Sequence, residues 1–145
     1  MIKNRKVYHD FEIKEEITAG MVLKSGELKA IQEGKVSLKE SFVSINGKEV
    51  FLKNATFTIP DYITFDRPDA KRDKKLLLTK NQINYLKREV EQDGFTLVPI
   101  KIIKLRNKFK LIIGLAKGLK KYDKRQKLKE KTQKREIQRA LKEYR

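Results

Sequence analysis

The sequence of 145 residues contains no cysteine, no tryptophan, three prolines and one histidine. Without cysteine the chain can form neither disulfides nor thiolate metal sites, and it has no cysteine nucleophile. The single imidazole, His9, is too few for a histidine-based metal site. These absences exclude the common zinc sites and fit a cytoplasmic protein.

Long apolar runs are also missing. No stretch approaches the roughly 20 residues that span a bilayer, and the C-terminal segment lacks the broad apolar face of an interfacial helix. Residues 1–16 run straight into charged side chains, without the pattern of a signal peptide. We therefore expect a cytoplasmic chain with no membrane partner.

Positive charge is abundant. The chain has 36 Lys and Arg against 19 Asp and Glu, a formal net charge of +17, and residues 118–145 alone carry +8. This segment has too few large apolar side chains to fold by itself, but it is rich in helix-forming residues. Such a composition predicts a tail that is disordered when free and becomes helical on a polyanion such as nucleic acid.

The first 34 residues predict a strand and a short helix. Residues 6–23 alternate loosely between apolar and polar side chains, which indicates a long strand with a bulge or bend at Ala19–Gly20. Ser25 then precedes a short helical pattern, and Gly34 is placed to end it.

The middle of the chain predicts a hairpin followed by a loop. Residues 36–45 and 49–59 have strand patterns and flank Asn46–Gly47, which is among the strongest short hairpin signals. Residues 60–75 are charged and contain two prolines, so we expect a surface loop.

The clearest helix signal follows that loop. Thr79 and Gln82 have the spacing of a capping box, in which each side chain satisfies a backbone N–H of the first turn. Apolar residues then recur at helical spacing until Gly94, which predicts the end of the helix.

Residues 95–105 and 109–116 predict a second hairpin, with Pro99 indicating an edge position or a bulge. Short antiparallel strands interrupted by two or three helices favour a mainly β fold, an OB-type closed antiparallel barrel over residues 1–117. The alternative is a β-sandwich. Residues 118–145 are then a basic tail.

Catalytic groups are hard to find in this sequence. In a strand, His9 and Asp10 would point to opposite faces and could not act together. Residues 114–118 lack the spacing of a phosphate-binding loop. Four aspartates could in principle bind Mg²⁺ in a nuclease, but they alternate with basic residues in a predicted surface loop: Asp61, Asp66, Asp69 and Asp73. We therefore expect no enzyme and no cofactor, and we interpret the excess of lysine and arginine as a nucleic-acid-binding surface.

Seven segments form a joint pattern: residues 4–13, 19–20, 26–43, 74–83, 94–102, 114–118 and 122–131. Taken together they resemble the SmpB family, the SsrA-binding proteins of bacterial trans-translation. The resemblance covers nearly the whole chain, in order and with compatible spacing.

The resemblance implies a binding protein that catalyses no reaction. Such a protein binds the tRNA-like domain of transfer-messenger RNA, travels with elongation factor Tu in the delivery complex, and takes the place of the missing anticodon arm. It enters the small-subunit decoding site of a ribosome stalled without a codon, and its tail becomes helical in the empty mRNA channel. We expect a monomer.

The resemblance also implies which residues contact RNA. Thr18 stands where the family usually has Glu before the Ala-Gly bend. Lys110 could meet phosphate directly, whereas Leu77 could only pack against a sugar or base or hold the surface in shape. The expected set for transfer-messenger RNA is Asn4, Arg5, Lys6, Tyr8, His9, Thr18, Leu77 and Lys110.

In the tail, the family pattern D-K-R-x-x-x-K is matched, but three positions depart from the usual residues. Lys131 replaces Arg and loses its bidentate fork, Gln133 replaces an aromatic residue, and Tyr122 replaces a His. The expected ribosome-binding residues are Tyr122, Asp123, Lys124, Arg125, Lys129 and Lys131.

One further hypothesis competes with this reading. A constitutive ribosomal protein that binds ribosomal RNA would have the same charge and fold class, and it would stay on all ribosomes instead of stalled ones.

Overall fold

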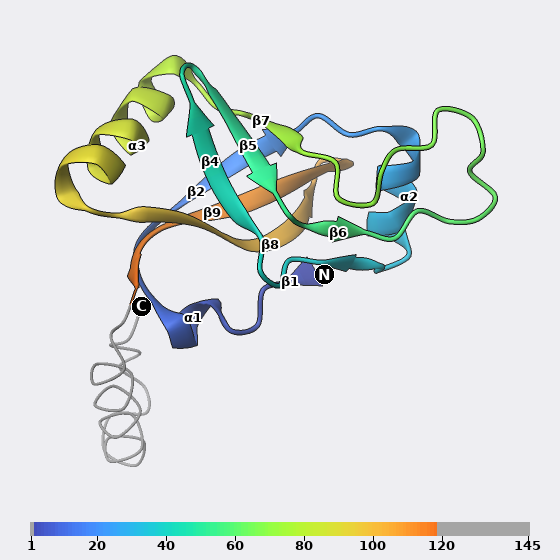
Figure 1. The fold of residues 1–145 in the computed structure, drawn as a ribbon, viewed down its shortest axis with the longest axis horizontal. Helices are drawn as coiled ribbons and strands as arrows, with labels where there is room; N and C mark the ends of the chain where they lie inside the picture. The colour runs from blue at the N-terminus through green and yellow to red at the C-terminus, as the bar shows by residue number, and fades with distance from the viewer. Residues whose placement is uncertain (1, 119–145) are drawn as a thin grey trace, which may run out of the picture.

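The computed structural model describes residues 2–118, which form a mainly antiparallel β structure with three short helices (Figure 1). The predicted fold class is confirmed at this level. The predicted tail lies outside the described residues, apart from Gly118. The helices are α1 (Val7–Asp10), α2 (Ser25–Gln32) and α3 (Lys80–Asp93). The strands are β1 (Ile2–Lys3), β2 (Phe11–Met21), β3 (Val36–Ser37), β4 (Phe42–Asn46), β5 (Glu49–Lys53), β6 (Thr56–Phe57), β7 (Lys74–Leu77), β8 (Thr96–Leu105) and β9 (Lys108–Gly118).

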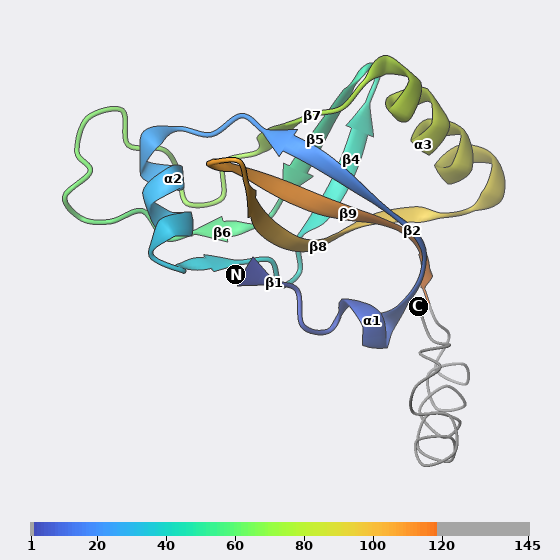
Figure 2. The same ribbon diagram turned by 180° about the vertical axis from the view of Figure 1, so that it is seen from behind.

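Seven of these strands form one curved sheet in the order β1-β8-β9-β2-β7-β5-β4, and β3 pairs with β6 in a small separate sheet. The inner face of the large sheet surrounds one apolar core, in which Val50, Leu111 and Ile113 are fully buried. The helices α2 and α3 lie at opposite ends of the curved sheet (Figures 1 and 2) and add Ala30 and Leu86 to this core.

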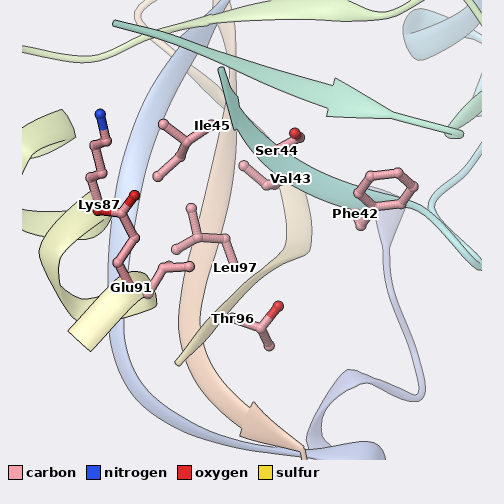
Figure 3. Close-up of a pocket in the computed structure, with 9 residues that line it drawn as sticks. Phe42, Val43, Ser44, Ile45, Lys87, Glu91, Thr96 and Leu97 are labelled. Carbon is pink, nitrogen blue, oxygen red and sulfur yellow. The ribbon is translucent and has the colours of Figure 1, made fainter. Parts of the chain in front are cut away.

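The predicted closed barrel is not found among the strand pairings of residues 2–118. The sheet curves until β4 packs against β8, but no hydrogen-bonded ladder joins these two strands in the described part of the chain. A groove of about 300 Å³ runs along this seam (Figure 3), and it is lined by side chains of β4, α3 and the start of β8, including Val43, Val90 and Leu97. Beneath this groove Val43 of β4 and Leu97 of β8 belong to the same buried core, so side chains join the two strands where a closed barrel would have backbone hydrogen bonds.

The predicted capping box at the start of α3 is present. The Thr79 hydroxyl accepts a hydrogen bond from the Gln82 backbone N–H at 3.1 Å, and the Gln82 side chain accepts one from the Thr79 N–H at 2.9 Å. Gly94 ends the helix with a left-handed φ of 72°. No helix within residues 2–118 is long and apolar enough to cross a membrane.

Replacing Thr79 with Ala should lower the free energy of unfolding by about 1 kcal/mol, because two backbone N–H groups lose their partners or their geometry. Urea unfolding of the purified protein measures this loss. The Lys80→Ala variant is the control, since Lys80 is exposed and follows the cap; its change should stay within about 0.5 kcal/mol. Equal stability of the two variants would contradict the role of the cap.

Two polar contacts fasten α3 to β2. Lys14 donates to Glu89 at 2.6 Å, and the Tyr85 hydroxyl donates to Glu15 at 2.7 Å. The hydrogen bond from Lys14 lowers the pKa of Glu89 below its ordinary value, and the hydrogen bond to Glu15 raises the pKa of Tyr85.

The N-terminal strand prediction was wrong at two points. Residues 7–10 form the helical turn α1, because Val7 packs against the sheet and is almost fully buried there. The bulge in β2 lies at Lys14, where the pairing with β9 shifts by one residue, and not at Ala19–Gly20. Gly20 instead pairs regularly with both neighbouring strands.

Both predicted hairpins are confirmed. Asn46 pairs with Glu49, and Gly47 has a left-handed φ of 65° in the turn between them. The second hairpin turns at Arg106–Asn107, and Pro99 lies at a register shift in β8, as a proline inside a paired strand requires.

The two predicted strands 36–45 and 49–59 are each broken into two. Their breaks lie at Glu40 and Asn54, which have positive φ angles of 64° and 63°, and the Asn54 side chain donates to the Glu40 carbonyl at 3.1 Å. The kinks allow the chain to leave the large sheet and form the β3–β6 pair.

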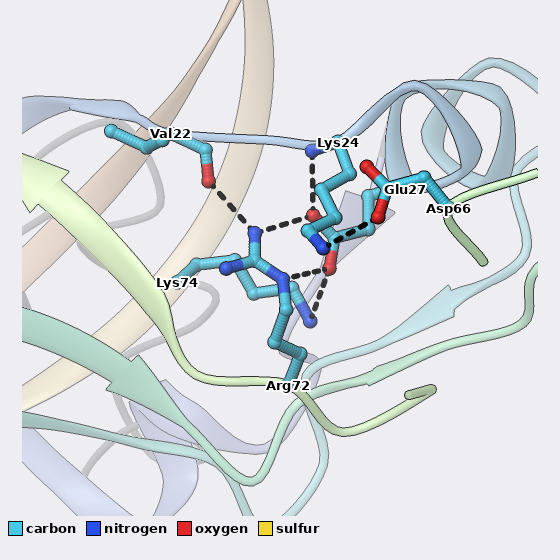
Figure 4. A network of polar contacts seen from close by, with 6 residues as sticks. All are labelled: Val22, Lys24, Glu27, Asp66, Arg72 and Lys74. Carbon is cyan, nitrogen blue, oxygen red and sulfur yellow. Dashed lines mark hydrogen bonds and ion pairs between the residues drawn. The ribbon is translucent and has the colours of Figure 1, made fainter. Parts of the chain in front are cut away.

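A buried ion cluster ties the loop of residues 58–73 to α2 (Figure 4). Glu27 is fully buried and accepts hydrogen bonds from Arg72 at 2.7 and 2.8 Å and from the Lys24 backbone N–H at 2.8 Å. The last contact places the cap of α2 at Lys24 and Glu27, whereas the sequence predicted Ser25 as the cap. Burial opposes ionisation of Glu27, but Arg72, the Lys24 N–H and Lys74 outweigh it and hold the pKa of Glu27 below its ordinary value.

Candidate nucleic-acid interface

The large sheet has a second apolar cluster on the face opposite the main core, which we call the outer face. Val7 of α1 packs there against Ile13, Val98 and Ile100. The turn α1 therefore covers one end of the outer face (Figure 2). Beyond it this face carries exposed side chains, among them Thr18 and Leu77.

Alternate residues of β2 point to the outer face beyond α1. Glu16, Thr18 and Gly20 follow one another at the two-residue spacing that places side chains on the same side of a strand. The Tyr8 hydroxyl of α1 donates to Glu16 at 2.7 Å, so this row begins at the N-terminal turn. Tyr8 and Thr18 are both exposed, and the same face presents them.

Gly20 lies between Leu77 of β7 and Lys110 of β9, because it pairs with both residues. A Cβ atom at Gly20 would come within 3.3 Å of the Leu77 Cβ and 3.5 Å of the Lys110 Nζ. Lys110 therefore lies across Gly20 towards Leu77, whose side chain is 53% exposed. A larger residue at position 20 would separate the apolar and cationic groups.

The sequence placed Tyr8 and Thr18 in one predicted strand, and Leu77 and Lys110 in two other segments. The fold brings all four residues to one face. Thr18, Leu77 and Lys110 are neighbours on adjacent strands, and Tyr8 joins them through Glu16. Glu16 and Gly20 were not among the predicted site residues, although the alternation along β2 could have identified both.

The other predicted N-terminal residues have separate surroundings. The Asn4 side chain donates to the Pro99 carbonyl at 2.9 Å, so it fixes the N-terminal segment against β8. Arg5 and Lys6 are exposed and line a cleft of about 850 Å³ between this segment and the β3–β4 connection.

The prediction that His9 and Asp10 point apart was wrong. Both residues belong to α1 and not to a strand, and the His9 Nδ1 lies 3.1 Å from the Asp10 Oδ1. Both side chains are substantially exposed, at 50% and 40%. The pair is a surface contact without the burial that a catalytic dyad needs to exclude water.

The four loop aspartates do not converge. Asp66 pairs with Lys24 at 3.1 Å, and Asp73 pairs with Lys53 at 3.9 Å. Within residues 2–118, no group of three or more histidines, aspartates or glutamates is arranged to hold a metal ion. The loop gives no support to the nuclease hypothesis.

Comparison with known proteins gives the family. The model of the family described as "SmpB protein" matches residues 1–143. The chain belongs to the SmpB protein family. The SsrA-binding protein of Neisseria meningitidis serogroup C (strain FAM18) is 44% identical over 143 residues, covering 98% of this chain and 97% of the relative. The SsrA-binding protein of Caldicellulosiruptor bescii is 43% identical over 141 residues, covering 97% and 89%.

A solved structure has the same fold. Its description reads "tmRNA-SmpB: a journey to the center of the bacterial ribosome". The matching chain has a TM-score of 0.68 at 38% sequence identity, and the match covers 92% of this chain and 94% of that one. The resemblance found in the sequence is confirmed at the level of the family. The predicted tail residues lie outside the described part of the chain, so their positions stay predictions.

Proposed function

We propose that this chain is a trans-translation factor, which binds transfer-messenger RNA and delivers it to stalled ribosomes. Family membership supports this proposal, together with the printed names of the SsrA-binding relatives and the description of the matching tmRNA-SmpB structure. The observation that supports the outer face as the RNA-binding surface is that Thr18, Leu77 and Lys110 are neighbours there.

The chemistry of this surface is that of a binding protein. Lys110 offers a cation for an RNA phosphate, and the exposed Leu77 offers an apolar surface to a sugar or a base. Tyr8 is exposed and aromatic, and it could stack on an unpaired base. None of these contacts requires a bond to be made or broken, so we propose an RNA-binding role without catalysis.

The proposal divides the work between the two parts of the chain. Residues 1–117 hold transfer-messenger RNA, with elongation factor Tu in the delivery complex. The curved sheet then serves as an OB-type barrel whose last seam is held by side chains. Residues 118–145 enter the decoding site and the vacant mRNA channel and become helical there. We infer that the protein acts as a monomer in the cytoplasm.

Binding to purified RNA tests the first half of this proposal. Leu77→Ala should weaken binding to transfer-messenger RNA about tenfold, a loss of about 1.4 kcal/mol, because exposed apolar surface loses its contact. The matched control is Leu28→Ala, since Leu28 is also exposed at 37% but lies on α2. Its affinity should stay within about twofold of the wild type.

Three outcomes would contradict the proposal. Equal affinity of the wild-type protein for transfer-messenger RNA and for an elongator tRNA would remove the proposed selectivity. Equal weakening by Leu77→Ala and Leu28→Ala would remove the outer face as the site. Stoichiometric retention on all ribosomes, stalled or not, would favour the constitutive ribosomal protein.

A further inference from the structure

Two further lysines, Lys3 and Lys101, lie on the outer face together with Lys110, which already belongs to the residues proposed to contact RNA. Lys3 of β1 pairs with Lys101 of β8, so both side chains point to the same face. Lys101 pairs with Ile112 of β9, which in turn pairs with Thr18. Lys110 lies two residues from Ile112 along the same strand and therefore points to the same face.

We propose that Lys3, Lys101 and Lys110 form a phosphate-binding row that holds the backbone of the bound RNA. The row extends the interface from Leu77 and Gly20 across β9 and β8 to the edge strand β1. This inference rests on the proposed function, because it names further contacts for the same RNA.

Geometry supports the row. Paired strands lie about 4.8 Å apart and successive residues rise about 3.4 Å, which places the Lys3 and Lys101 Cα atoms about 5 Å apart and those of Lys101 and Lys110 about 8 Å apart. A nucleic-acid duplex carries one phosphate per strand about every 3.4 Å of axis. A path of about 13 Å corresponds to about four such steps, so the three lysines can contact separate phosphates of one strand.

The charges of the three lysines are available to a ligand. None of them forms an ion pair with another described residue, whereas lysines at the other end of the same face are paired. The Lys75 Nζ lies 3.0 Å from the Glu49 Oε2, and the Lys53 Nζ lies 3.9 Å from the Asp73 Oδ2. The uncompensated charge of the outer face is thus concentrated on β1, β8 and β9.

Strand register separates this row from lysines that only keep the protein soluble. Lys104 is on the same strand as Lys101, but it pairs with Phe109, whose side chain packs against the main core. Lys104 therefore points to the opposite face while adding the same charge to the chain. If only net charge mattered, replacing Lys101 or Lys104 would weaken RNA binding equally. A phosphate-binding row predicts that only the replacement of Lys101 weakens it.

The experiment measures the affinity of the full chain for transfer-messenger RNA between about 50 and 200 mM salt, where each phosphate contact contributes about 0.9 to the slope of log K against log salt. Lys101→Ala should reduce the slope by about 0.9, and the double variant of Lys3 and Lys101 should reduce it by about 1.8. Lys101→Arg should retain the slope. Lys104→Ala should match the wild type.

Equal slopes for Lys101→Ala, Lys104→Ala and the wild type would overturn the row while leaving the proposed function standing. Leu77→Ala separates the two questions, because it should weaken binding without changing the slope. A wild-type chain that does not prefer transfer-messenger RNA over an elongator tRNA would overturn the proposed function, and the row as a site for this RNA with it.

Discussion

Deleting residues 123–145 should abolish peptide tagging on stalled ribosomes and leave binding to transfer-messenger RNA nearly unchanged. The deleted segment carries ten Lys or Arg and four Asp or Glu, whereas the residues proposed to hold the RNA lie on the folded sheet. Without the tail, no part of the chain remains to occupy the mRNA channel. Binding at about 200 mM salt should stay within about threefold of the full chain, because this salt suppresses the nonspecific charge effect of the tail.

The control is a full-length chain in which residues 123–145 are scrambled at constant composition. This variant keeps the charge of the tail but loses the D-K-R-x-x-x-K order of residues 123–129. We expect it to tag less than the wild type in a purified translation system, because the proposed role of the tail depends on the order of these residues. Full tagging by the scrambled chain would show that charge alone suffices. Tagging by the deleted chain would contradict the proposed role of the tail altogether.

Local signals in the sequence predicted much of the fold. The helix α3 was predicted from its cap to its end because the Thr79–Gln82 box and Gly94 each satisfy backbone groups within a single turn. The first hairpin was predicted from Asn46–Gly47, because these residues tolerate the positive φ that such turns require. The second was predicted from the two strand patterns that flank residues 106–108.

The wrong predictions concern features that depend on distant parts of the chain. The kinks at Glu40 and Asn54 are joined by a hydrogen bond between residues that are 14 positions apart in the sequence. No local pattern in either predicted strand indicates this contact. The turn α1 forms because Val7 packs against residues of β2 and β8. The closed barrel is a different case, because it stays unconfirmed: it depends on how the distant strands β4 and β8 meet, and no ladder joins them within residues 2–118.

The candidate site divides in the same way. Thr18, Leu77 and Lys110 were found by resemblance, but their adjacency follows from the pairing of β2 with both β7 and β9. Lys3 and Lys101 had no signal in the sequence, since lysine is frequent throughout the chain. Only strand register separates them from the other lysines.

The second prediction with a large effect concerns the stability of the fold and the ion cluster around Glu27. Glu27 and Lys74 are fully buried, and one carboxylate serves two cations, since Lys74 lies 3.5 Å from Glu27 and Arg72 binds it through two hydrogen bonds. The Lys74 ammonium also lies over the Phe57 ring, 3.9 Å from its centre. Loss of the carboxylate would leave a buried ammonium without an anion.

Glu27→Gln should therefore destabilise the fold by about 3–5 kcal/mol, the usual cost of removing one partner from a buried ion pair. Thermal or urea unfolding of the variant measures it. The control is Glu49→Gln, because Glu49 pairs with Lys75 on the surface at 3.0 Å and both side chains are about half exposed. Its cost should be at most about 1 kcal/mol, and equal costs for the two variants would contradict the account of the cluster.

The same carboxylate should appear in the pH dependence of stability. The pKa of Glu27 is held below its ordinary value of 4.5 in the folded protein, so the unfolded chain takes up this proton at a higher pH. The stabilisation is complete above about pH 5 and is lost as the pH falls through the folded-state pKa. Unfolding between about pH 5 and 3 should thus show a shallower loss for Glu27→Gln than for the wild type.

Lys74→Met should behave in the opposite way to Glu27→Gln. The Lys74 Nζ is buried and has no hydrogen-bond partner among the described residues, and burial lowers its pKa from the ordinary value of 10.5. Methionine fills a similar volume, its sulfur packs well against an aromatic ring such as Phe57, and Arg72 still neutralises Glu27. The change should cost less than about 1 kcal/mol or stabilise the fold. A loss as large as that of Glu27→Gln would mean that Lys74 contributes a necessary charge, and that the cluster needs both cations.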